Sequence, residues 1–420
     1  MRILLKIILK ILAKRVIARY QPKVIGVTGS VGKTTAKEAI YALLRYKFNI
    51  WKTEDNFNNE IGLPMTILGV NPRLANKGNK FGVVLHLIRA VWLAYGWPRQ
   101  NYPKVLVLEI AADRPGDLNY LVDIAKPQIG VVTAVGEVPV HVEFYASPKA
   151  VAKEKSILIE SLPSDGLSIL NYDDDTVLDM REKSKAHVTT IGFSEHADIW
   201  ASDVSFIISD DERSLGGLSF KVHQGESFMP FRINNLIGLQ QVYAILAAVA
   251  VGIHFNINMV EISSILESFE LPADRMNLMR GIKNTTIIND VYNASPTSMH
   301  AALDTLRIFG DNVIKMHGRG RKIAVLGDMR ELGKYSEQAH RDMGLLTTEC
   351  ADILITVGTH SKLLADSAMA LMGQDKIFVF SSSDDAKLKV QELIEEGDII
   401  LVKGSRGMHM EKILEEIVEN

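Results

Sequence analysis

The segment "TGSVGKTT" (28–35) contains the residue types that bind the phosphates of a nucleotide. It follows an apolar, strand-like run and precedes a run with helical apolar spacing, which is the order that a phosphate-binding loop requires. Loop amides at a helix N-terminus bind phosphate oxygens, a lysine reaches the terminal phosphates, and a threonine hydroxyl binds Mg²⁺. The sequence therefore predicts a nucleoside triphosphate site made by Gly29, Ser30, Gly32, Lys33, Thr34 and Thr35.

Three further candidates lie at or after predicted strands. Glu109 ends the apolar run 104–110, His141 follows the run 129–135 by a short loop, and Lys155 lies in a predicted helix. In an open parallel sheet the carboxyl ends of the strands face the ligand crevice, where carboxylate, imidazole and phosphate oxygens can share Mg²⁺. Each residue also has a structural interpretation: Glu109 could pair with a cation, His141 could cap a loop, and Lys155 could be solvated.

The elements that position these residues are typical of an α/β protein. Short apolar runs alternate with helical segments, except that residues 171–234 read as alternating strands and turns. We predict a P-loop central domain with a parallel sheet and a small β-rich portion, followed by a C-terminal doubly wound, Rossmann-like domain. The predicted boundaries give a leading helix (1–22), a central domain (23–272) and a C-terminal domain (273–420), because Pro272 interrupts the pattern.

Composition excludes some partners. The chain has 420 residues with 47 basic and 50 acidic side chains, so no global positive charge indicates nucleic acid as a partner. Cys350 is the only cysteine, which excludes an intrachain disulfide and suits a reducing, cytoplasmic compartment.

Two apolar segments raise the question of a membrane. In residues 1–20 the cations Arg2, Lys6, Lys10 and Lys14 recur every four residues, which predicts a cationic amphipathic helix and interrupts any membrane span. Such a helix either docks on the body of the protein or lies in the membrane interface. Residues 81–97 are apolar with aromatic side chains and form either a core helix or part of the same interfacial patch. The second alternative in each case predicts a protein that binds peripherally to the inner face of the cell membrane.

Six segments together resemble the Mur ligase family. They are "TGSVGKTT", "DNFNNEIGLP" (55–64), "VHVEFYASPKAVAKEKS" (140–156), "NDVYNASPTSMHAAL" (289–303), "VLGDMRELG" (325–333) and "VKGSRG" (402–407). The likeness runs in order from about residue 23 to 417, and this family's loop reads Thr-Gly-Ser/Thr-x-Gly-Lys-Thr. The resemblance therefore covers nearly the whole chain.

The resemblance implies an ATP-dependent amide ligase of cell-wall peptidoglycan precursor synthesis. In this chemistry ATP phosphorylates a muramyl-peptide-type carboxylate to an acyl phosphate, and the amine of an amino acid or a D-Ala-D-Ala-like dipeptide displaces the phosphate. ATP and Mg²⁺ are the implied cofactors. A related ligase on another acid, such as a polyglutamate, an amino-acid polymer or a pseudomurein-type peptide, and a non-catalytic, nucleotide-gated membrane scaffold remain the alternatives.

Residue roles carry over by position in these motifs. Lys33, Glu109, His141 and Lys155 would be catalytic; Thr34 and Glu109 would hold the first Mg²⁺, and His141 would hold a second beside a carbamylated Lys155. Asn58 and Asn59 match paired asparagines beside the reacting carboxylate. Gln241 would lie near the adenine, and the last domain would bring further residues to the nucleotide (Arg275, Asp290 and Asn293) and to the amino substrate (Lys403, Ser405 and Arg406).

The start of the chain departs from the family pattern. A domain of about one hundred residues that holds uridine diphosphate usually precedes the central domain, whereas about twenty-two residues precede it here. We therefore expect an acceptor that is reached through the membrane surface, or a separate protein that supplies the uridine-binding domain.

Overall fold

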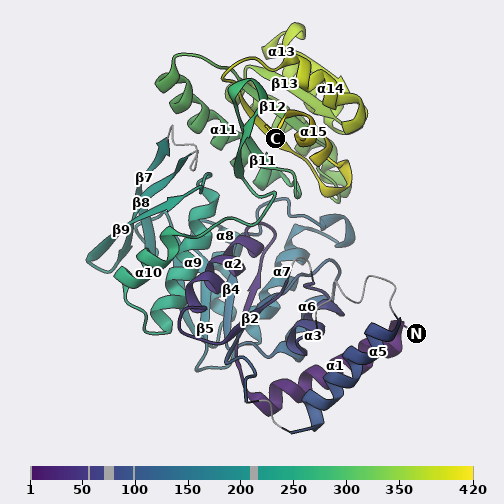
Figure 1. Cartoon of the computed structure of the whole chain (residues 1–420), viewed down its shortest axis with the longest axis vertical. Helices are drawn as coiled ribbons and strands as arrows, with labels where there is room; N and C mark the ends of the chain where they lie inside the picture. Colours follow the sequence, from purple (N-terminus) through teal and green to yellow (C-terminus); the bar gives the residue numbers. More distant parts are fainter. Residues whose placement is uncertain (1, 55–56, 71–79, 98–99, 209–215, 420) are drawn as a thin grey trace.

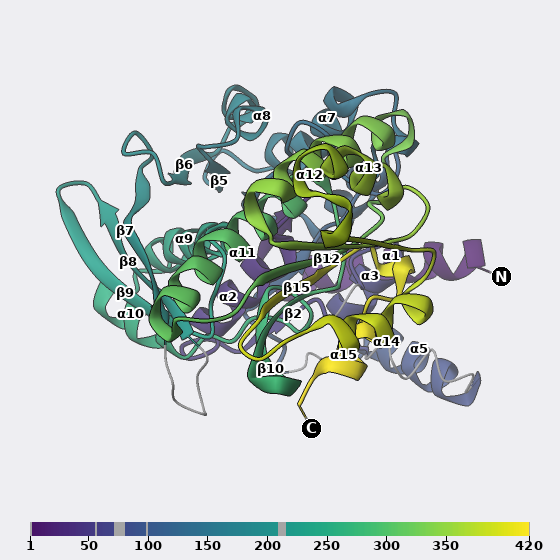
Figure 2. The same cartoon turned by 90° about the horizontal axis from the view of Figure 1, so that it is seen from above.

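The predicted α/β fold class is confirmed. The computed structural model describes residues 2–54, 57–70, 80–97, 100–208 and 216–419, with only the backbone described at residues 2 and 80–86. Two sheets, each mostly parallel, form a lower and an upper lobe in Figure 1. Seen from above, the upper lobe lies over the lower one, while β7–β9 and α5 extend to opposite sides (Figure 2).

The lower lobe is built on a nine-stranded sheet with the order β2-β3-β1-β4-β5-β6-β7-β8-β9. Strands β2 to β7 pair in parallel, and β7 to β9 form an antiparallel portion within residues 171–234, which were predicted to be rich in strands. The strand bounds are β1 Lys23–Thr28, β2 Ile50–Lys52, β3 Val105–Glu109, β4 Ile129–Val132, β5 Leu167–Asn171, β6 His187–Gly192, β7 Ile199–Ile208, β8 Gly216–Gln224 and β9 Ser227–Asn234.

Helices cover both faces of this sheet, as expected for buried parallel strands. One face packs against α2 (Lys33–Leu44), α9 (Gln240–His254) and α10 (Met259–Glu267). The other face packs against α1 (Arg2–Tyr20), α3 (Gly62–Ile67), α5 (Lys80–Tyr95), α6 (Asp117–Ala125) and α7 (Pro148–Glu160). The short helix α8 (Asp175–Leu178) follows β5.

The upper lobe has a six-stranded sheet with the order β10-β11-β15-β12-β13-β14, in which only β10 is antiparallel. This is the predicted Rossmann-like arrangement. The elements are β10 Asn277–Gly281, β11 Thr285–Asp290, α11 Pro296–His317, β12 Lys322–Gly327, α12 Ser336–Cys350, β13 Ile353–Val357, α13 Ser361–Met372, β14 Ile377–Phe380, α14 Ser383–Leu393, β15 Ile399–Lys403 and α15 Glu411–Ile417.

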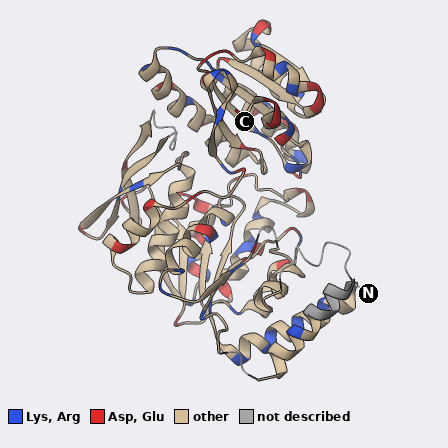
Figure 3. Cartoon of the chain, in the orientation of Figure 1, with Lys and Arg blue, Asp and Glu red and all other residues tan. Residues whose placement is uncertain are grey.

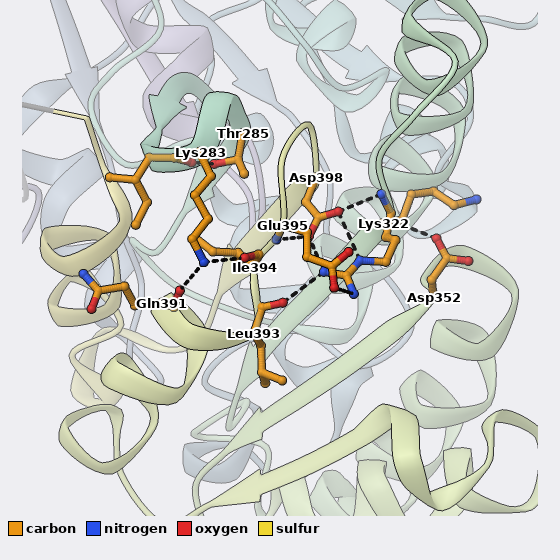
Figure 4. A network of polar contacts seen from close by, with 11 residues as sticks. Lys283, Thr285, Lys322, Asp352, Gln391, Leu393, Ile394, Glu395 and Asp398 are labelled. Carbon is orange, nitrogen blue, oxygen red and sulfur yellow. Dashed lines mark hydrogen bonds and ion pairs between the residues drawn. The ribbon is translucent and has the colours of Figure 1, made fainter.

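A buried carboxylate fixes the amino ends of β12 and β15. Asp398 is 1 % exposed and accepts hydrogen bonds from the backbone and guanidinium of Arg321 and from the backbone of Glu395 (Figure 4). In the same network Lys283 donates to the carbonyls of Gln391 and Ile394. Asp398 is paired with Arg321, and the Lys283 ammonium is satisfied by carbonyls, so this network stabilises the sheet at the end away from the ligand crevice.

The leading helix is docked on the lower lobe. Leu9, Leu12, Ala13, Val16 and Ile17 of α1 are at most 7 % exposed. The predicted lysine stripe faces the body of the protein, because Lys6 pairs with Glu60, and Lys10 and Lys14 pair with Asp123. These two lysines lower the pKa of Asp123 to about 2.

The membrane alternative for the two apolar segments stays open. Helix α5 runs beside α1, so the two predicted segments do lie together. Residue 1 and the side chains of residues 81–86, which belong to this prediction, lie outside the described residues.

Candidate active site

The glycine loop between β1 and α2 has the geometry of an anion site. Gly29 and Gly32 have φ angles of 147° and 86°, which favour glycine. A Cβ at Gly29 would lie 2.1 Å from the Thr133 hydroxyl, so the loop also needs glycine for space. Gly32 caps α2, and this glycine has no side chain that could bond to the first helical amides. These N–H groups therefore remain available to phosphate oxygens.

Lys33 and Thr34 begin α2 at this loop. The Lys33 Nζ donates to the Ser30 carbonyl at 3.2 Å, and burial lowers the pKa of Lys33. Thr34 Oγ1 donates to Glu109 Oε2 at 2.8 Å. Thr35 is buried, as are Thr34 and Glu109. The predicted phosphate loop and the predicted strand-end carboxylate are therefore in direct contact.

Asn58 joins the same carboxylate, whereas Asn59 does not. The Asn58 Nδ2 donates to Glu109 Oε1 at 2.9 Å. The Asn59 Oδ1 instead accepts from the backbone of Ile61 and Gly62 at the start of α3. The paired asparagines thus divide: Asn58 orients Glu109, and Asn59 fixes the turn that carries Asn58.

Glu109 is held from behind by residues that the sequence did not single out. Thr53 Oγ1 accepts from the Glu109 backbone N–H, and the Thr53 carbonyl accepts from Lys37 Nζ at 2.6 Å. Lys37 is fully buried and also lies 3.0 Å from Glu38. In the sequence, only the position of Lys37, one helical turn after the phosphate loop, could have indicated that it helps to hold Glu109.

Lys155 is buried, which excludes the interpretation that it is a solvated side chain. It is 2 % exposed, and its Nζ donates to the Gly29 carbonyl at 2.9 Å. Burial and the neighbouring cation Lys33 lower the pKa of Lys155 to about 7. At physiological pH, Lys155 is therefore a neutral, nucleophilic amine in a substantial fraction of the protein molecules.

His141 lies between two carboxylates that the sequence analysis missed. Its Nδ1 is 2.5 Å from Glu331 Oε2 of the upper lobe, and its Nε2 is 3.4 Å from Asp113 Oδ1. The Glu331 contact is short but not aligned as a hydrogen bond, since Nδ1 has no well-formed bond. The imidazole lowers the pKa of Glu331. Glu331 stands in the quoted segment 325–333, but its partner His141 lies far away in the sequence.

A cavity of about 800 Å³ opens beside Thr34 between the two lobes. Arg275 lies over the ring of Tyr292 at 3.8 Å, and Arg406 lies over the same ring at 5.6 Å. These three residues line the cavity. Gln241 is 7 % exposed in the first turn of α9 and does not line it.

The remaining upper-lobe candidates are occupied within the protein. Lys403 Nζ is 2.5 Å from Asp290 Oδ2 and donates to the Asn293 carbonyl at 3.0 Å. Lys403 is 1 % exposed. Ser405 is 2 % exposed, and its hydroxyl accepts from the Arg330 backbone. Lys403 and Ser405 thus lie in the segment that carries Arg406 to the cavity, and we call residues 403–406 the amino-substrate wall.

The oxygen donors at the loop fit Mg²⁺. This ion is usually held by one or two carboxylates together with substrate phosphates and water, and Thr34 and Glu109 supply a hydroxyl and a carboxylate side by side. Among the described side chains, no three of His, Cys, Asp or Glu are grouped closely enough to hold a metal alone. The residues therefore fit an ion that is shared with phosphate oxygens.

Comparison with known proteins identifies the family of this chain. The Mur ligase middle domain matches residues 27–83 and 97–252, and the Mur ligase glutamate ligase domain matches residues 274–406. The chain is 31% identical over 412 residues to the UDP-N-acetylmuramoyl-tripeptide--D-alanyl-D-alanine ligase of Bacillus subtilis (strain 168), covering 97% of this chain and 79% of that protein. The chain belongs to the Mur ligase family.

Solved Mur ligases share its fold. The MurF crystal structure from Acinetobacter baumannii matches with a TM-score of 0.78 and 25% identity, covering 98% of this chain and 80% of that one. MurF from Thermotoga maritima in complex with ADP matches with a TM-score of 0.76 and 25% identity, covering 97% and 82%. A pseudomurein peptide ligase type C from Methanothermus fervidus, at 15% identity and a TM-score of 0.64, shares the fold alone. This Mur ligase is an ATP-dependent enzyme, as its family and its phosphate loop require.

The buried pair in the upper lobe yields a stability prediction. Replacing Lys403→Met leaves the Asp290 carboxylate without its cation, and we expect the free energy of unfolding to fall by about 3–5 kcal/mol. The double variant with Asp290→Asn should recover part of the loss. Urea unfolding measures both. Lys322→Met, which breaks the surface pair with Asp311, is the control and should cost no more than about 1 kcal/mol; equal losses for the two single variants would contradict the prediction.

Proposed function

We propose that this protein joins an amino acid or a D-Ala-D-Ala-like dipeptide to the carboxylate of a muramyl peptide, as a step in the synthesis of peptidoglycan precursors. The similarity to the Bacillus subtilis ligase, which extends over 97% of this chain, carries the proposal. The contacts among Lys33, Thr34, Glu109 and Asn58 support it, because they assemble the phosphate end of the site. The proposed domain boundaries are 22/23 and 272/273.

The chain's own groups suit a reaction through an acyl phosphate. A carboxylate is a poor acyl donor, and transfer of the ATP γ-phosphoryl group to its oxygen creates a good leaving group. Lys33 and the amides at the start of α2 would stabilise negative charge on the transferred group. Thr34 and Glu109 would hold Mg²⁺, which neutralises phosphate charge when bound. The amine then attacks the carbonyl carbon, and the carbon–oxygen bond to phosphate breaks.

The nucleotide and the two substrates would meet at the boundary between the lobes. We assign Gly29, Ser30, Gly32 and Thr35 to the phosphates, and Gln241, Arg275, Asp290 and Asn293 to the rest of the nucleotide site. Asn58 and Asn59 would lie on the muramyl-peptide side. Arg406 faces the cavity and could meet the amino substrate directly, with Lys403 and Ser405 behind it.

A phosphate-release assay tests this function. UDP-linked and lipid-linked muramyl tripeptides and unrelated acids would each be combined with D-Ala-D-Ala and with single amino acids. We expect release only when a muramyl peptide and an amino substrate are both present, with one amide formed per phosphate. Lys33→Ala should lower kcat by at least about a hundredfold, because it removes the cation of the phosphate loop. Turnover only with folate or an amino-acid polymer would assign another ligase activity, and no turnover with any pair would favour a scaffold.

We also propose that Lys155 carries a carbamate that holds a second Mg²⁺ together with His141. The neutral amine nitrogen attacks carbon dioxide, forms a carbon–nitrogen bond and loses a proton, which gives an anionic oxygen ligand. The lowered pKa of Lys155 supports this reaction, because only the unprotonated amine can attack. The product would also remove the unfavourable proximity of two cations, Lys33 and Lys155.

The carbamate predicts a pH-dependent signal. In ¹³C-bicarbonate buffer, a carbamate resonance should be present at pH 8 and decline as the pH falls through about 7, because protonation of Lys155 then competes with carbamylation. Lys155→Ala should lack the resonance and lose the dependence of activity on bicarbonate. Lys153→Ala, on the exposed face of the same helix, should retain both. A resonance that survives in Lys155→Ala would contradict the assignment.

We place the reaction in the cytoplasm, at the inner face of the cell membrane. No described helix is long and apolar enough to span a bilayer, so the contact would be peripheral. Half of the large apolar side chains exposed among the described residues lie on or directly after α1 and α5: Ile3, Leu4, Ile7, Ile11, Ile88, Val91, Trp92, Tyr95 and Trp97. Such a concentration marks an interaction surface.

Charge and aromatic content favour an anionic bilayer as the occupant. Helices α1 and α5 contain lysine and arginine but no acidic residue, as Figure 3 shows. Arg15 lies at a hollow lined by Ile7 and Ile11, whereas Lys10 and Lys14 at the same hollow are already paired with Asp123. Tryptophan and tyrosine prefer the headgroup region, where an apolar ring and a polar tip are both satisfied.

Vesicle flotation tests this surface. The protein should float with vesicles containing phosphatidylglycerol, and less so at high salt. Trp92→Glu combined with Trp97→Glu should lower partition at least about tenfold, since two large apolar side chains leave the interface. Leu371→Glu, at an equally exposed apolar side chain on α13, is the control and should not change partition. Unchanged flotation of the double variant would overturn the proposal. It would also be overturned if the wild type self-associates and the double variant does not, because the surface would then bind a second copy of the chain.

A further inference from the structure

The loop after β4 is enclosed by the upper lobe at several points. A Cβ at Gly136 would lie 2.3 Å from the Thr297 hydroxyl at the start of α11. Gly333 lies against the backbone of Glu143, and Tyr335 packs against the apolar cluster that contains Val142. The loop that carries His141 is therefore part of the contact between the two lobes.

The His141–Glu331 contact lies at the centre of this interface. Both residues have left-handed backbones, with φ angles of 68° and 64°, which is uncommon outside glycine and persists where surrounding contacts fix it. The Glu143 backbone N–H donates to the Glu331 carbonyl across the interface at 3.3 Å. Backbone and side chain of Glu331 thus both contact the His141 loop.

The position of Glu331 is set by Ser405, which was predicted to lie where the amino substrate binds. The Arg330 backbone N–H donates to Ser405 Oγ at 2.8 Å, and the Ser405 backbone N–H donates to the Asp328 carbonyl at 3.0 Å. Residues 328–331 therefore form a turn that is tied to the end of β15. A chain of contacts leads from Ser405 through this turn to the imidazole of His141.

We infer that Glu331 is a positioning residue that keeps the proton of His141 on Nδ1 and leaves Nε2 free to bind the second metal ion. The carboxylate lies beside Nδ1, whereas Nε2 faces the lower lobe near Asp113. The contact is not aligned as a hydrogen bond, but the negative charge of the carboxylate 2.5 Å from Nδ1 favours a proton on that nitrogen. In metal sites, a carboxylate on the second ring nitrogen fixes the tautomer and orientation of the ligand. The inference rests on the proposed role of His141 as a ligand.

This arrangement couples metal binding to contact between the lobes. Glu331 reaches His141 only while the upper lobe is docked on the loop after β4, so docking favours the tautomer that can bind the ion. By linkage, binding of the ion stabilises the docked state to the same extent. His141 would therefore be ready to bind the second metal ion only when the upper lobe, with Ser405 and Arg406, is docked on the loop after β4.

The tautomer can be read directly by ¹⁵N NMR of histidine-labelled protein without metal, with His141→Gln to assign the signal. We expect Nδ1 to carry the proton in the wild type, Glu331→Ala to shift the population towards the Nε2–H form, and Glu331→Gln to restore it in part through its carbonyl oxygen. Glu337→Ala, which removes an exposed carboxylate of the same lobe paired with Arg341, is the matched control and should leave the signal unchanged.

Metal affinity supplies the second readout. With ADP bound, Mn²⁺ titration followed by electron paramagnetic resonance should show the weaker of two sites losing about tenfold or more in affinity in Glu331→Ala but not in Glu337→Ala. An unchanged tautomer and unchanged Mn²⁺ affinity in Glu331→Ala would overturn the inference. Neither measurement requires turnover, so failure to find an acceptor would refute the proposed function and leave this test intact.

Discussion

The packing of Gly29 against the end of β4 is the constraint on which the site depends. Its missing Cβ lets Thr133 approach the phosphate loop, where the threonine hydroxyl also contacts the carbonyls of Thr28 and Val31. The Gly29 carbonyl in turn accepts from Lys155. One glycine therefore joins the phosphate loop, the strand that leads to His141, and the helix that carries Lys155. A larger residue would separate these three parts.

Electrostatics explains why these parts require a polyanion. Lys155 is buried and Lys33 is partly buried. The charge of Lys33 raises the cost of charging Lys155, while Glu109 is the main nearby acid that favours the charged form of Lys33. Burial of cations without matching anions is unfavourable, and the site lowers that cost by depressing the pKa of both lysines. Phosphate groups would supply negative charge beside Lys33 and so favour its charged form.

The sequence predicted residues whose position follows from strand order, and it missed contacts between distant segments. Strand-end logic placed Glu109 beside the phosphate loop, because the carboxyl ends of parallel strands share one edge. It could not show that Lys403 is neutralised by Asp290 or that the α1 lysines pair with the body, because such pairs depend on how separate elements pack. Glu331 was missed for the same reason: its partner His141 lies in the other lobe.

The two ionic networks of the upper sheet show how position determines use. At the amino ends of β12 and β15, Asp398 is surrounded by Arg321 and neighbouring backbone groups, all internal to one lobe. At the carboxyl ends, Lys403 and Asp290 pair beside a cavity that faces the other lobe. A movement of one lobe against the other would leave the surroundings of Asp398 unchanged, but it would change what lies next to the carboxyl ends. Groups at that edge can therefore respond to substrate. Before substrate binds, the Lys403–Asp290 pair keeps their side chains in place.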